Sequence, residues 1–410
     1  MKRFTLSLLA LSLLASCTCQ GASEGIRRGS PLSVGMDGHR LELIDSAVYA
    51  AIGSGEIPGA VVGVVRHGTL VYEKAYGFKS MVPEEEPMTV ETLFDLASVS
   101  KCVGTTLSFM QLVEQGKVRL VDRVDQYIPE FAPWKDKKTR EKDRITVQDL
   151  LTHSSGLDPF LRDVPAYVER YGAGTPDSLV HWIATEVPRN FKPGTQQLYS
   201  CFNFIILQRI LEQVTGERLC DYAQKHVFDV LGLQHTTYFP VVSPAHPELA
   251  HLCAPTEVLP DGHVLQAEVH DPTARIINLG NSGNAGVFSN VEDLAVIAAA
   301  LLNGGAWDGH RILSPLTVQR MFSVPADNDP SVARALGWDT YYLAPYASGD
   351  VFPLTDLRGH TGYTGTFLLL DPVTDTAVIL LSNRVHPTDT GSVSRLRSVV
   401  SSIVASSILR

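Results

Sequence analysis

The sequence predicts an α/β (α+β) fold in which an antiparallel sheet is built from both ends of the chain and flanked by helices. Apolar runs typical of strands occur early, at 60–65 and 69–76, and again late, at 366–370 and 377–382. Between them, from roughly 117 to 285, the pattern is mostly helical, without regular alternation of strands. We therefore expect one sheet shared by the two chain ends, with a helical insertion.

The first residues of the sequence predict an export signal. Lys2 and Arg3 precede an apolar stretch that ends in Leu14-Ala15-Ser16-Cys17. This tetrapeptide resembles a bacterial lipobox, in which the cysteine is lipidated and becomes the mature N-terminus. An ordinary secretory signal, cleaved nearby at a small residue, is the alternative. Either way we expect an exported protein, and the lipobox predicts a membrane-anchored lipoprotein of a bacterial envelope, on its periplasmic or surface face.

These signals divide the chain into three segments. Residues 1–16 are the expected signal peptide with its lipobox, and residues 17–35 form a polar tether that contains Gly, Ser and Arg. Residues 36–410 form the expected folded domain. With 44% hydrophobic and 19% charged residues among 410, the chain has ample apolar material for a large core.

The composition argues against several kinds of function. The formal net charge of −10 is not that of a nucleic-acid-binding protein, which would present a basic face. Apart from Cys17, the five cysteines are scattered and odd in number, so they do not suggest a disulfide framework. No Cys-x-x-Cys or His-Glu-x-x-His motif occurs. We predict no metal, no cofactor and no nucleic-acid partner, and leave the oligomeric state open.

Local signals in the first part of the chain place several elements. Apolar residues at helical spacing predict a helix over 37–53, and Arg66-His67-Gly68 predicts the turn of the first hairpin. A helix that begins near Ser98 ends at Gln115-Gly116. The charged stretch 129–144 is expected to be an exposed connection, followed by a short helix up to Leu151.

Later helices have clear start and stop signals. One is predicted over 205–214 and ends at Gly216. Another follows Ser289-Asn290-Val291-Glu292, which has the spacing of a capping box, and ends at Asn303-Gly304-Gly305. A last helix is predicted over 392–407.

The first chemical motif is Ser98-Val99-Ser100-Lys101. Positions three apart share a helix face, about 5–6 Å apart at Cβ. The Lys101 amine is therefore within reach of the Ser98 hydroxyl, as an activating base must be of its nucleophile. Ser98 also lies near a helix N-terminus, where unpaired N–H groups favour developing negative charge. A serine and a lysine at this spacing more often lie on a solvated helix face. The other motifs must therefore show whether this pair is catalytic.

Two further segments carry chemistry. Pro193-Gly194 predicts a turn that delivers Tyr199 to the entrance of the helix at 205–214. The run Arg358-Gly359-His360-Thr361-Gly362-Tyr363-Thr364-Gly365 is placed on a late strand. Glycines within a strand often mark the close approach of a ligand or another backbone.

In this order the motifs resemble those of the serine hydrolases of the penicillin-binding-protein and class C β-lactamase clan, including its esterases. That clan has Ser-x-x-Lys, then Tyr-x-Asn, then Lys-Thr-Gly or His-x-Gly. The matching positions here are Ser98 and Lys101, Tyr199 and Cys201, and His360, Thr361 and Gly362. The resemblance extends to 145–157, 285–289 and 380–384 and covers about Gly35 to Arg410. It implies a β-lactamase/transpeptidase-like fold, with the loop 280–286 bordering the substrate pocket.

The resemblance also implies roles. Ser98 is the expected nucleophile and Tyr199 the expected general base. Because an unperturbed tyrosine has a pKa of about 10, we expect the Lys101 ammonium to lower the pKa of Tyr199. Lys101 acting as the base itself is the alternative. The oxyanion hole is expected to consist of the backbone N–H groups of Ser98 and Tyr363.

Two departures from the clan's pattern bear on the substrate. Cys201 replaces the asparagine that contacts the substrate amide in β-lactamases and penicillin-binding proteins, which favours ester cleavage. His360 replaces a lysine and, at an ordinary pKa, is only about a quarter protonated at neutral pH, so it holds a substrate carboxylate less firmly. Arg358, two residues earlier on the same strand face, is a candidate for the missing cation, against a solvated charge at the strand entrance.

Other candidate residues have structural interpretations. His153, beside Ser154 and Ser155, is interpreted as part of a structural turn. Cys102 is interpreted as a small buried hydrophobe rather than a thiol nucleophile. Within the expected folded domain, residues 36–410, no Gly-x-Ser-x-Gly elbow occurs, which argues against an α/β-hydrolase.

The expected function is therefore an exported serine hydrolase that forms an acyl-enzyme on Ser98 and cleaves a carboxylic ester or related acyl bond. A D-Ala-D-Ala carboxypeptidase or endopeptidase, or a β-lactamase, would use the same machinery. A non-catalytic cell-wall-binding lipoprotein is the third hypothesis. The expected partners are a small-molecule ester, peptide or β-lactam substrate, and the membrane through the lipid anchor.

Overall fold

The structure is a computed structural model that describes residues 25–340, 345–353 and 355–409. Its main sheet has eight strands in the order β1-β3-β2-β15-β14-β13-β12, with β4 also paired to β3. The strands are β1 (Arg27–Arg28), β2 (Gly59–Arg66), β3 (Thr69–Ser80), β4 (Glu86–Pro87), β12 (Asp339–Thr340), β13 (Arg358–Thr361), β14 (Phe367–Asp371) and β15 (Thr376–Ser382). The order confirms a sheet built from both ends of the chain.

The central pairing of this sheet joins the two chain ends. β2 and β15 are antiparallel, with Ala60 opposite Ser382 and Val64 opposite Val378. All eight residues of β2 are buried, as expected for a strand covered on both faces. The predicted hairpin is present as β2 and β3. Among the described strands of this sheet, only β1 pairs in the parallel direction.

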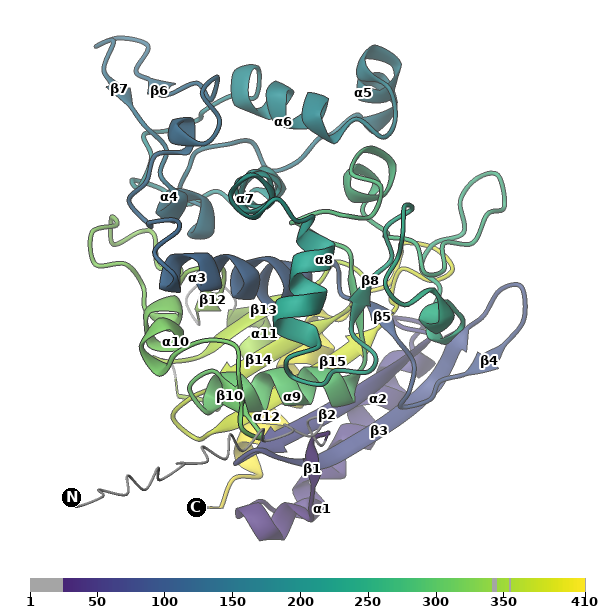
Figure 1. The fold of residues 1–410 in the computed structure, drawn as a ribbon. Helices are drawn as coiled ribbons and strands as arrows, with labels where there is room; N and C mark the ends of the chain where they lie inside the picture. Colours follow the sequence, from purple (N-terminus) through teal and green to yellow (C-terminus); the bar gives the residue numbers. More distant parts are fainter. Residues whose placement is uncertain (1–24, 341–344, 354, 410) are drawn as a thin grey trace, which may run out of the picture.

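Helices cover both faces of the sheet (Figure 1). On one face lie α1 (Gly38–Leu41), α2 (Leu43–Gly53) and α12 (Ser394–Ser406), and on the other lies α9 (Val291–Leu302). Gly63 of β2 allows the close approach of α9, because a Cβ on this residue would lie 2.3 Å from Val291 Cγ1. The sheet is therefore the middle layer of three.

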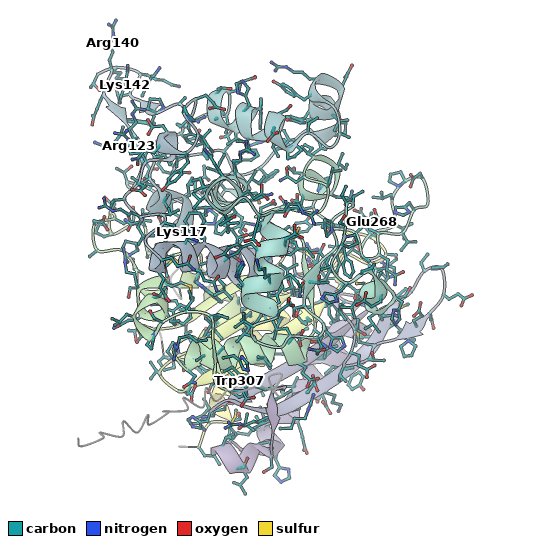
Figure 2. All side chains as sticks on the ribbon, viewed as in Figure 1. Lys117, Arg123, Arg140, Lys142, Glu268 and Trp307 are labelled. Atoms are coloured by element: carbon teal, nitrogen blue, oxygen red, sulfur yellow. The ribbon has the colours of Figure 1, made fainter. Side chains whose placement is uncertain are left out.

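A mostly helical lobe stands beyond α9 at the upper part of Figure 1. Its helices are α3 (Leu107–Glu114), α4 (Val147–Leu151), α5 (Val164–Tyr171), α6 (Pro176–Thr185), α7 (Cys201–Thr215) and α8 (Leu219–Ala223). The stretch expected to be an exposed connection contains the small hairpin β6 (Trp134–Lys135) and β7 (Lys142–Asp143). Figure 2 shows Arg140 and Lys142 at its outer end, pointing away from the molecule.

A second, small sheet joins the lobe to the main sheet. It consists of β5 (Phe94–Asp95), β9 (Val287–Ser289) and β8 (Thr237–Tyr238), in that order. The remaining elements are the hairpin of β10 (Ala306–Trp307) and β11 (His310–Arg311), α10 (Pro315–Phe322) and α11 (Pro345–Ser348). Since Ser98 lies three residues after the end of β5, this sheet fixes where the nucleophile segment begins.

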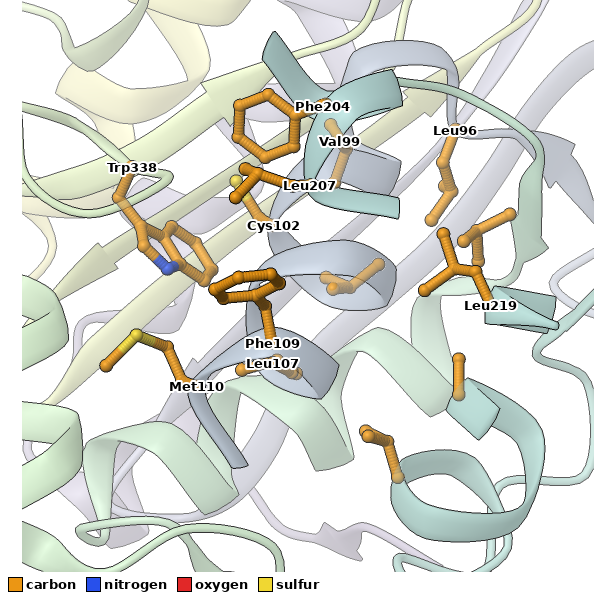
Figure 3. Packing of buried hydrophobic residues seen from close by; sticks show 14 of the residues in the cluster. Leu96, Val99, Cys102, Leu107, Phe109, Met110, Phe204, Leu207, Leu219 and Trp338 are labelled. Atoms are coloured by element: carbon orange, nitrogen blue, oxygen red, sulfur yellow. The ribbon is translucent and has the colours of Figure 1, made fainter. Parts of the chain in front are cut away.

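The core of the lobe packs against the helix that follows Ser98. Figure 3 shows Cys102 and Phe109 of this helical segment in one cluster with Phe204, Leu207 and Trp338, and all five side chains are buried. Cys102 therefore packs as a small core residue, which confirms its interpretation. The Cys102 thiol donates a hydrogen bond to the Gly337 carbonyl oxygen at 3.2 Å.

Several boundaries differ from the sequence prediction. The helix expected over 37–53 is interrupted at Glu42, whose N–H bonds to the carbonyl oxygens of Gly38 and Arg40. The helix after Ser98 begins with π-helical turns over Lys101–Thr106 before α3. The N-cap of α9 is Asn290, whose Oδ1 accepts from Asp293 N at 2.9 Å, rather than the preceding serine.

Other boundaries agree more closely. α7 ends at Gly216, which has a φ of 74° and so takes the left-handed conformation that glycine favours.

The late strand predicted at 358–365 is shorter than expected, because β13 ends at Thr361 and a turn begins at Gly362. Across the described ranges, no helix is both long and apolar enough to span a membrane.

Candidate active site

The nucleophile segment begins with a strained residue. Ala97 has a φ of 45°, in the left-handed region that non-glycine residues rarely adopt. The Asp95 carboxylate accepts hydrogen bonds from Ala97 N at 2.8 Å and from His270 N at 2.7 Å. Burial raises the pKa of Asp95 to about 6. These bonds hold the turn that presents the next residue, Ser98.

Lys101 is fully buried and lies where the spacing predicts. Its Nζ is 3.0 Å from Ser98 Oγ, 2.7 Å from the Asn284 carbonyl oxygen and 3.6 Å from Cys201 Sγ. An ammonium has three N–H donors, so these three contacts satisfy it completely. Burial opposes the charge, but Cys201 and Tyr199 favour it, and the pKa of Lys101 is raised above its ordinary value.

Tyr199 reaches the same place from the lobe, at the entrance of α7. His153 holds Tyr199 there by hydrogen bonds to the residues immediately before and after it. The carbonyl oxygen of His153 accepts from Leu198 N at 2.9 Å, and its Nδ1 accepts from Ser200 N at 3.1 Å. The imidazole also packs at a tilt of 36° against the Tyr199 ring, with centroids 4.4 Å apart. His153 is thus a structural residue, as predicted.

The expected low pKa of Tyr199 is wrong for the free protein. Lys101 Nζ lies 5.0 Å from the centroid of the Tyr199 ring, close enough to favour the phenolate. Burial acts in the opposite direction and is the larger effect, so the pKa of Tyr199 is raised above its ordinary value. The hydrophobic periodicity of the sequence does not show how deeply the Tyr199 side chain is buried.

The end of β13 is tied to the nucleophile segment. Thr364 Oγ1 donates to the Asp95 carbonyl oxygen at 2.7 Å, and Thr366 Oγ1 donates to the Leu96 carbonyl oxygen at 2.8 Å. A Cβ on Gly362 would lie 2.5 Å from the same Leu96 oxygen. Glycine is therefore required where the strand passes the nucleophile. His360, Thr361 and Gly362 all border the same cleft as Ser98.

His360 does not carry the partial charge expected of it. Burial lowers the pKa of His360 to about 4, so the imidazole is neutral at pH 7. Its Nδ1 lies 2.8 Å from the Thr361 carbonyl oxygen, which can only accept a hydrogen bond. Nδ1 therefore carries the proton, and Nε2 is left as an acceptor.

Arg358 is not the missing cation. Its Nε donates to the Phe322 carbonyl oxygen, and its Nη1 donates to the Leu357 carbonyl oxygen at 2.7 Å. It borders a separate depression beside α10 and the end of α9. The side chain shares a strand face with His360, but it does not border the cleft that contains Ser98.

Cys201 and Tyr363 have specific surroundings. The Cys201 thiol adjoins Lys101, and burial raises its pKa. The Tyr363 side chain is 57% exposed, with its hydroxyl donating to Asp389 and its ring stacked on His270. The place of the Tyr363 N–H in an oxyanion hole stays a prediction.

These residues surround an open cleft of about 670 Å³. The cleft is lined by Ser98, Gln197, Tyr199, Arg334, Asp339, His360, Thr361, Gly362, Tyr363, Arg384, Gly391, Ser392, Val393, Ser394 and Arg397. Within the described ranges no cluster of three or more His, Cys, Asp or Glu side chains could hold a metal ion. Cys17, the predicted lipidation site, lies outside the described residues.

Arg334 and Asp339 were not anticipated. Arg334 is only 1% exposed, forms an ion pair with Asp339, and has its Cζ 5.7 Å from the centroid of the Tyr199 ring. One sequence signal does point to them. Opposite charges bracket the apolar run 335–338, which is unusual for a segment that is buried.

Comparison with known proteins fits this geometry. The family model described as "Beta-lactamase" matches residues 44–399. The chain belongs to the beta-lactamase family. It is a serine hydrolase of the clan that its motifs resemble.

Two relatives of similar length share close to a third of their residues with this member of the family. The N-acetylmuramyl-L-alanine amidase of Bacillus subtilis (strain 168) is 31% identical over 370 residues, which cover 85% of this chain and 81% of the relative. A putative D-alanyl-D-alanine carboxypeptidase of Escherichia coli (strain K12) is 32% identical over 404 residues, covering 93% and 91%.

Solved structures share the fold. EstCE1, described as a hydrolase with promiscuous acyltransferase activity, superposes with a TM-score of 0.70 at 25% identity, covering 90% of this chain and 99% of EstCE1. The octameric penicillin-binding protein homologue from Pyrococcus abyssi superposes with a TM-score of 0.66 at 21% identity, covering 88% and 76%. The fold class is confirmed as β-lactamase/transpeptidase-like.

The raised pKa values of Lys101 and Tyr199 predict a pH profile. Because the deprotonated form of the base is the minor species near neutrality, kcat/KM should rise about tenfold per pH unit from about pH 7 to about pH 9. The measurement is hydrolysis of a short-chain nitrophenyl ester, with the Ser98→Ala variant as the correction for background. A plateau already reached below about pH 7 would show that the base is ionised in the free enzyme.

Proposed function

We propose that this chain is an exported amidohydrolase that cleaves cell-wall-derived peptides through an acyl-enzyme on Ser98. The observation that carries the proposal is the 3.0 Å contact between Lys101 Nζ and Ser98 Oγ at the wall of the open cleft. The substrate class is supported by the two relatives above 30% identity, one named an N-acetylmuramyl-L-alanine amidase and the other a putative D-alanyl-D-alanine carboxypeptidase.

In this proposal Ser98 Oγ attacks the carbonyl carbon of the scissile amide. The base takes the hydroxyl proton as the new C–O bond forms, and the backbone N–H groups of Ser98 and Tyr363 stabilise the negative oxygen. The C–N bond then breaks, and the base returns the proton to the leaving nitrogen. A water molecule releases the acyl group from Ser98 by the same sequence of proton transfers.

Tyr199 is the base that best fits the site in this mechanism. The raised pKa of Lys101 and its three acceptors favour the ammonium form, which has no lone pair for the serine proton. The same positive charge, 5.0 Å from the Tyr199 ring, stabilises a phenolate when it forms. Lys101 would then orient Ser98 and compensate the charge on Tyr199.

Ester cleavage is the second candidate. Cys201 stands where the clan has an asparagine that contacts the substrate amide, and a thiol offers no equivalent pair of donor and acceptor. An ester needs no amide recognition and passes through the same acyl-enzyme. EstCE1, a hydrolase by its description, is similar over most of the chain.

One panel of substrates tests both candidates. Wild type and Ser98→Ala would be assayed with N-acetylmuramyl-L-alanine, diacetyl-L-lysyl-D-alanyl-D-alanine, a short-chain nitrophenyl ester and a chromogenic cephalosporin. We expect amide turnover, and a fall in kcat/KM of about 1,000-fold or more in Ser98→Ala. Ser54→Ala, an exposed serine at the end of α2, is the matched control.

The other possible outcomes of this panel distinguish the candidate activities from one another. Ester turnover without amide turnover would favour the esterase, and cephalosporin turnover would favour a β-lactamase. Activity that survives intact in Ser98→Ala would contradict the acyl-enzyme on Ser98.

We also propose that Cys17 is lipidated and anchors the protein to a membrane of the bacterial envelope. Leu14-Ala15-Ser16-Cys17 supports this. In Cys17→Ala the protein should move from the membrane fraction to the soluble fraction, whereas Cys19→Ala, two residues away, should not change its distribution. The distribution is measured by cell fractionation and immunoblotting. If Cys17→Ala stays in the membrane fraction, the lipid anchor is refuted.

A further inference from the structure

A buried arginine beside the nucleophile has donors without acceptors. Arg334 is 1% exposed, and its Nη1 forms the ion pair with Asp339 Oδ1. Its Nε and Nη2 have no hydrogen-bond partner in the described part of the chain. Leaving charged donors unpaired in a buried place is costly, and such groups in native proteins usually serve a purpose.

The two unpaired donors have a particular geometry. Nε–H and one Nη2–H lie parallel along one edge of the planar guanidinium, the edge that binds both oxygens of a carboxylate at once. Asp339 occupies the other side, through Nη1, and so fixes the plane of the group without using that edge. A lysine could not offer this paired arrangement.

The location of Arg334 indicates which part of a substrate it would meet. Its Cζ lies 5.7 Å from the centroid of the Tyr199 ring, and both side chains border the cleft that contains Ser98. The base that takes the serine proton must return it to the leaving atom. The leaving group is therefore expected beside Tyr199, and Arg334 lies over the ring of that residue.

Three other basic residues of the cleft wall do not supply an equivalent. Arg397 Nη2 donates to the carbonyl oxygens of Gly362 and Thr366. His360 is neutral, and the proton on its Nδ1 is directed at the Thr361 carbonyl oxygen. Arg384 Nη1 donates to Asp389 and to the Gly391 carbonyl oxygen.

We propose that Arg334 binds a carboxylate on the leaving-group part of the substrate, through Nε and Nη2. The inference rests on the proposed function and narrows its substrate class. The preferred substrates are acyl compounds whose leaving group is an amino acid or peptide with a free carboxylate. Asp339 is the positioning residue that balances the buried charge while the cleft holds no substrate.

The first test is binding to a form of the protein that cannot turn the ligand over. Ser98→Ala would be titrated calorimetrically with N-acetylmuramyl-L-alanine and with diacetyl-L-lysyl-D-alanyl-D-alanine, each compared with its C-terminal carboxamide. We expect the acid of at least one pair to bind about tenfold more tightly than its amide, as a charge-assisted bidentate pair would give. Equal affinities for acid and amide in both pairs would overturn the proposal.

Variants then assign the preference to a residue. In Ser98→Ala/Arg334→Gln the affinities for acid and amide should become equal, mainly through weaker binding of the acid. Ser98→Ala/Arg384→Gln, which removes another arginine of the cleft wall, should keep the ratio of the two. If Arg334→Gln keeps the preference, the carboxylate binds elsewhere and the proposal fails.

Two precautions keep the result interpretable. If thermal unfolding shows that Arg334→Gln does not fold, Arg334→Lys keeps the charge but loses the paired edge, and a full acid preference in that variant would count against the proposal. The binding readout does not depend on turnover. If Ser98→Ala shows no preference for the acid while the wild type turns the substrates over, only the role of Arg334 is refuted. If Ser98→Ala prefers the acid but the wild type shows no turnover, only the proposed function is refuted.

Discussion

The site depends on one buried ammonium. Lys101 has no exposed surface, and a charge in such a place is tolerated only when its donors are satisfied. Its three acceptors come from three separate parts of the chain, namely Ser98 in its own turn, Asn284 in the loop before β9, and Cys201 at the start of α7. The charge that orients the nucleophile therefore also requires the lobe and the loop to be in place.

Hydrogen bonds between segments that are distant in the sequence hold the other parts of the site in place. The turn after β13 bonds to the carbonyl oxygens of Asp95 and Leu96, so the late strand and the nucleophile segment are held in register. His153 fixes the backbone on both sides of Tyr199. Burial then sets the charge states, since it raises the pKa of Tyr199 and lowers that of His360 to about 4.

Much of this arrangement was predictable from local pattern. The strands at both chain ends, α7 with its glycine stop, and the pair Ser98 and Lys101 follow from periodicity and spacing, because those features depend on neighbours in sequence. Arg358 was misjudged for the opposite reason. The strand face of Arg358 was assigned correctly. However, its guanidinium donates to the carbonyl oxygen of Phe322, and the sequence near Arg358 does not reveal that partner. Arg334 was missed because its role depends on Asp339 and Tyr199 meeting in space. The charge states also depend on burial, which arises only when the lobe packs against the sheet.

The most direct test of the account is to trap and map the acyl group. The protein would be mixed with a short-chain nitrophenyl ester, quenched in acid within the first turnovers, digested and analysed by mass spectrometry. The account predicts one acyl adduct, on Ser98, and its reduction to background in Lys101→Met, which removes the ammonium but keeps most of the length of the side chain. An adduct on Cys201 instead, or undiminished acylation of Ser98 in Lys101→Met, would contradict it.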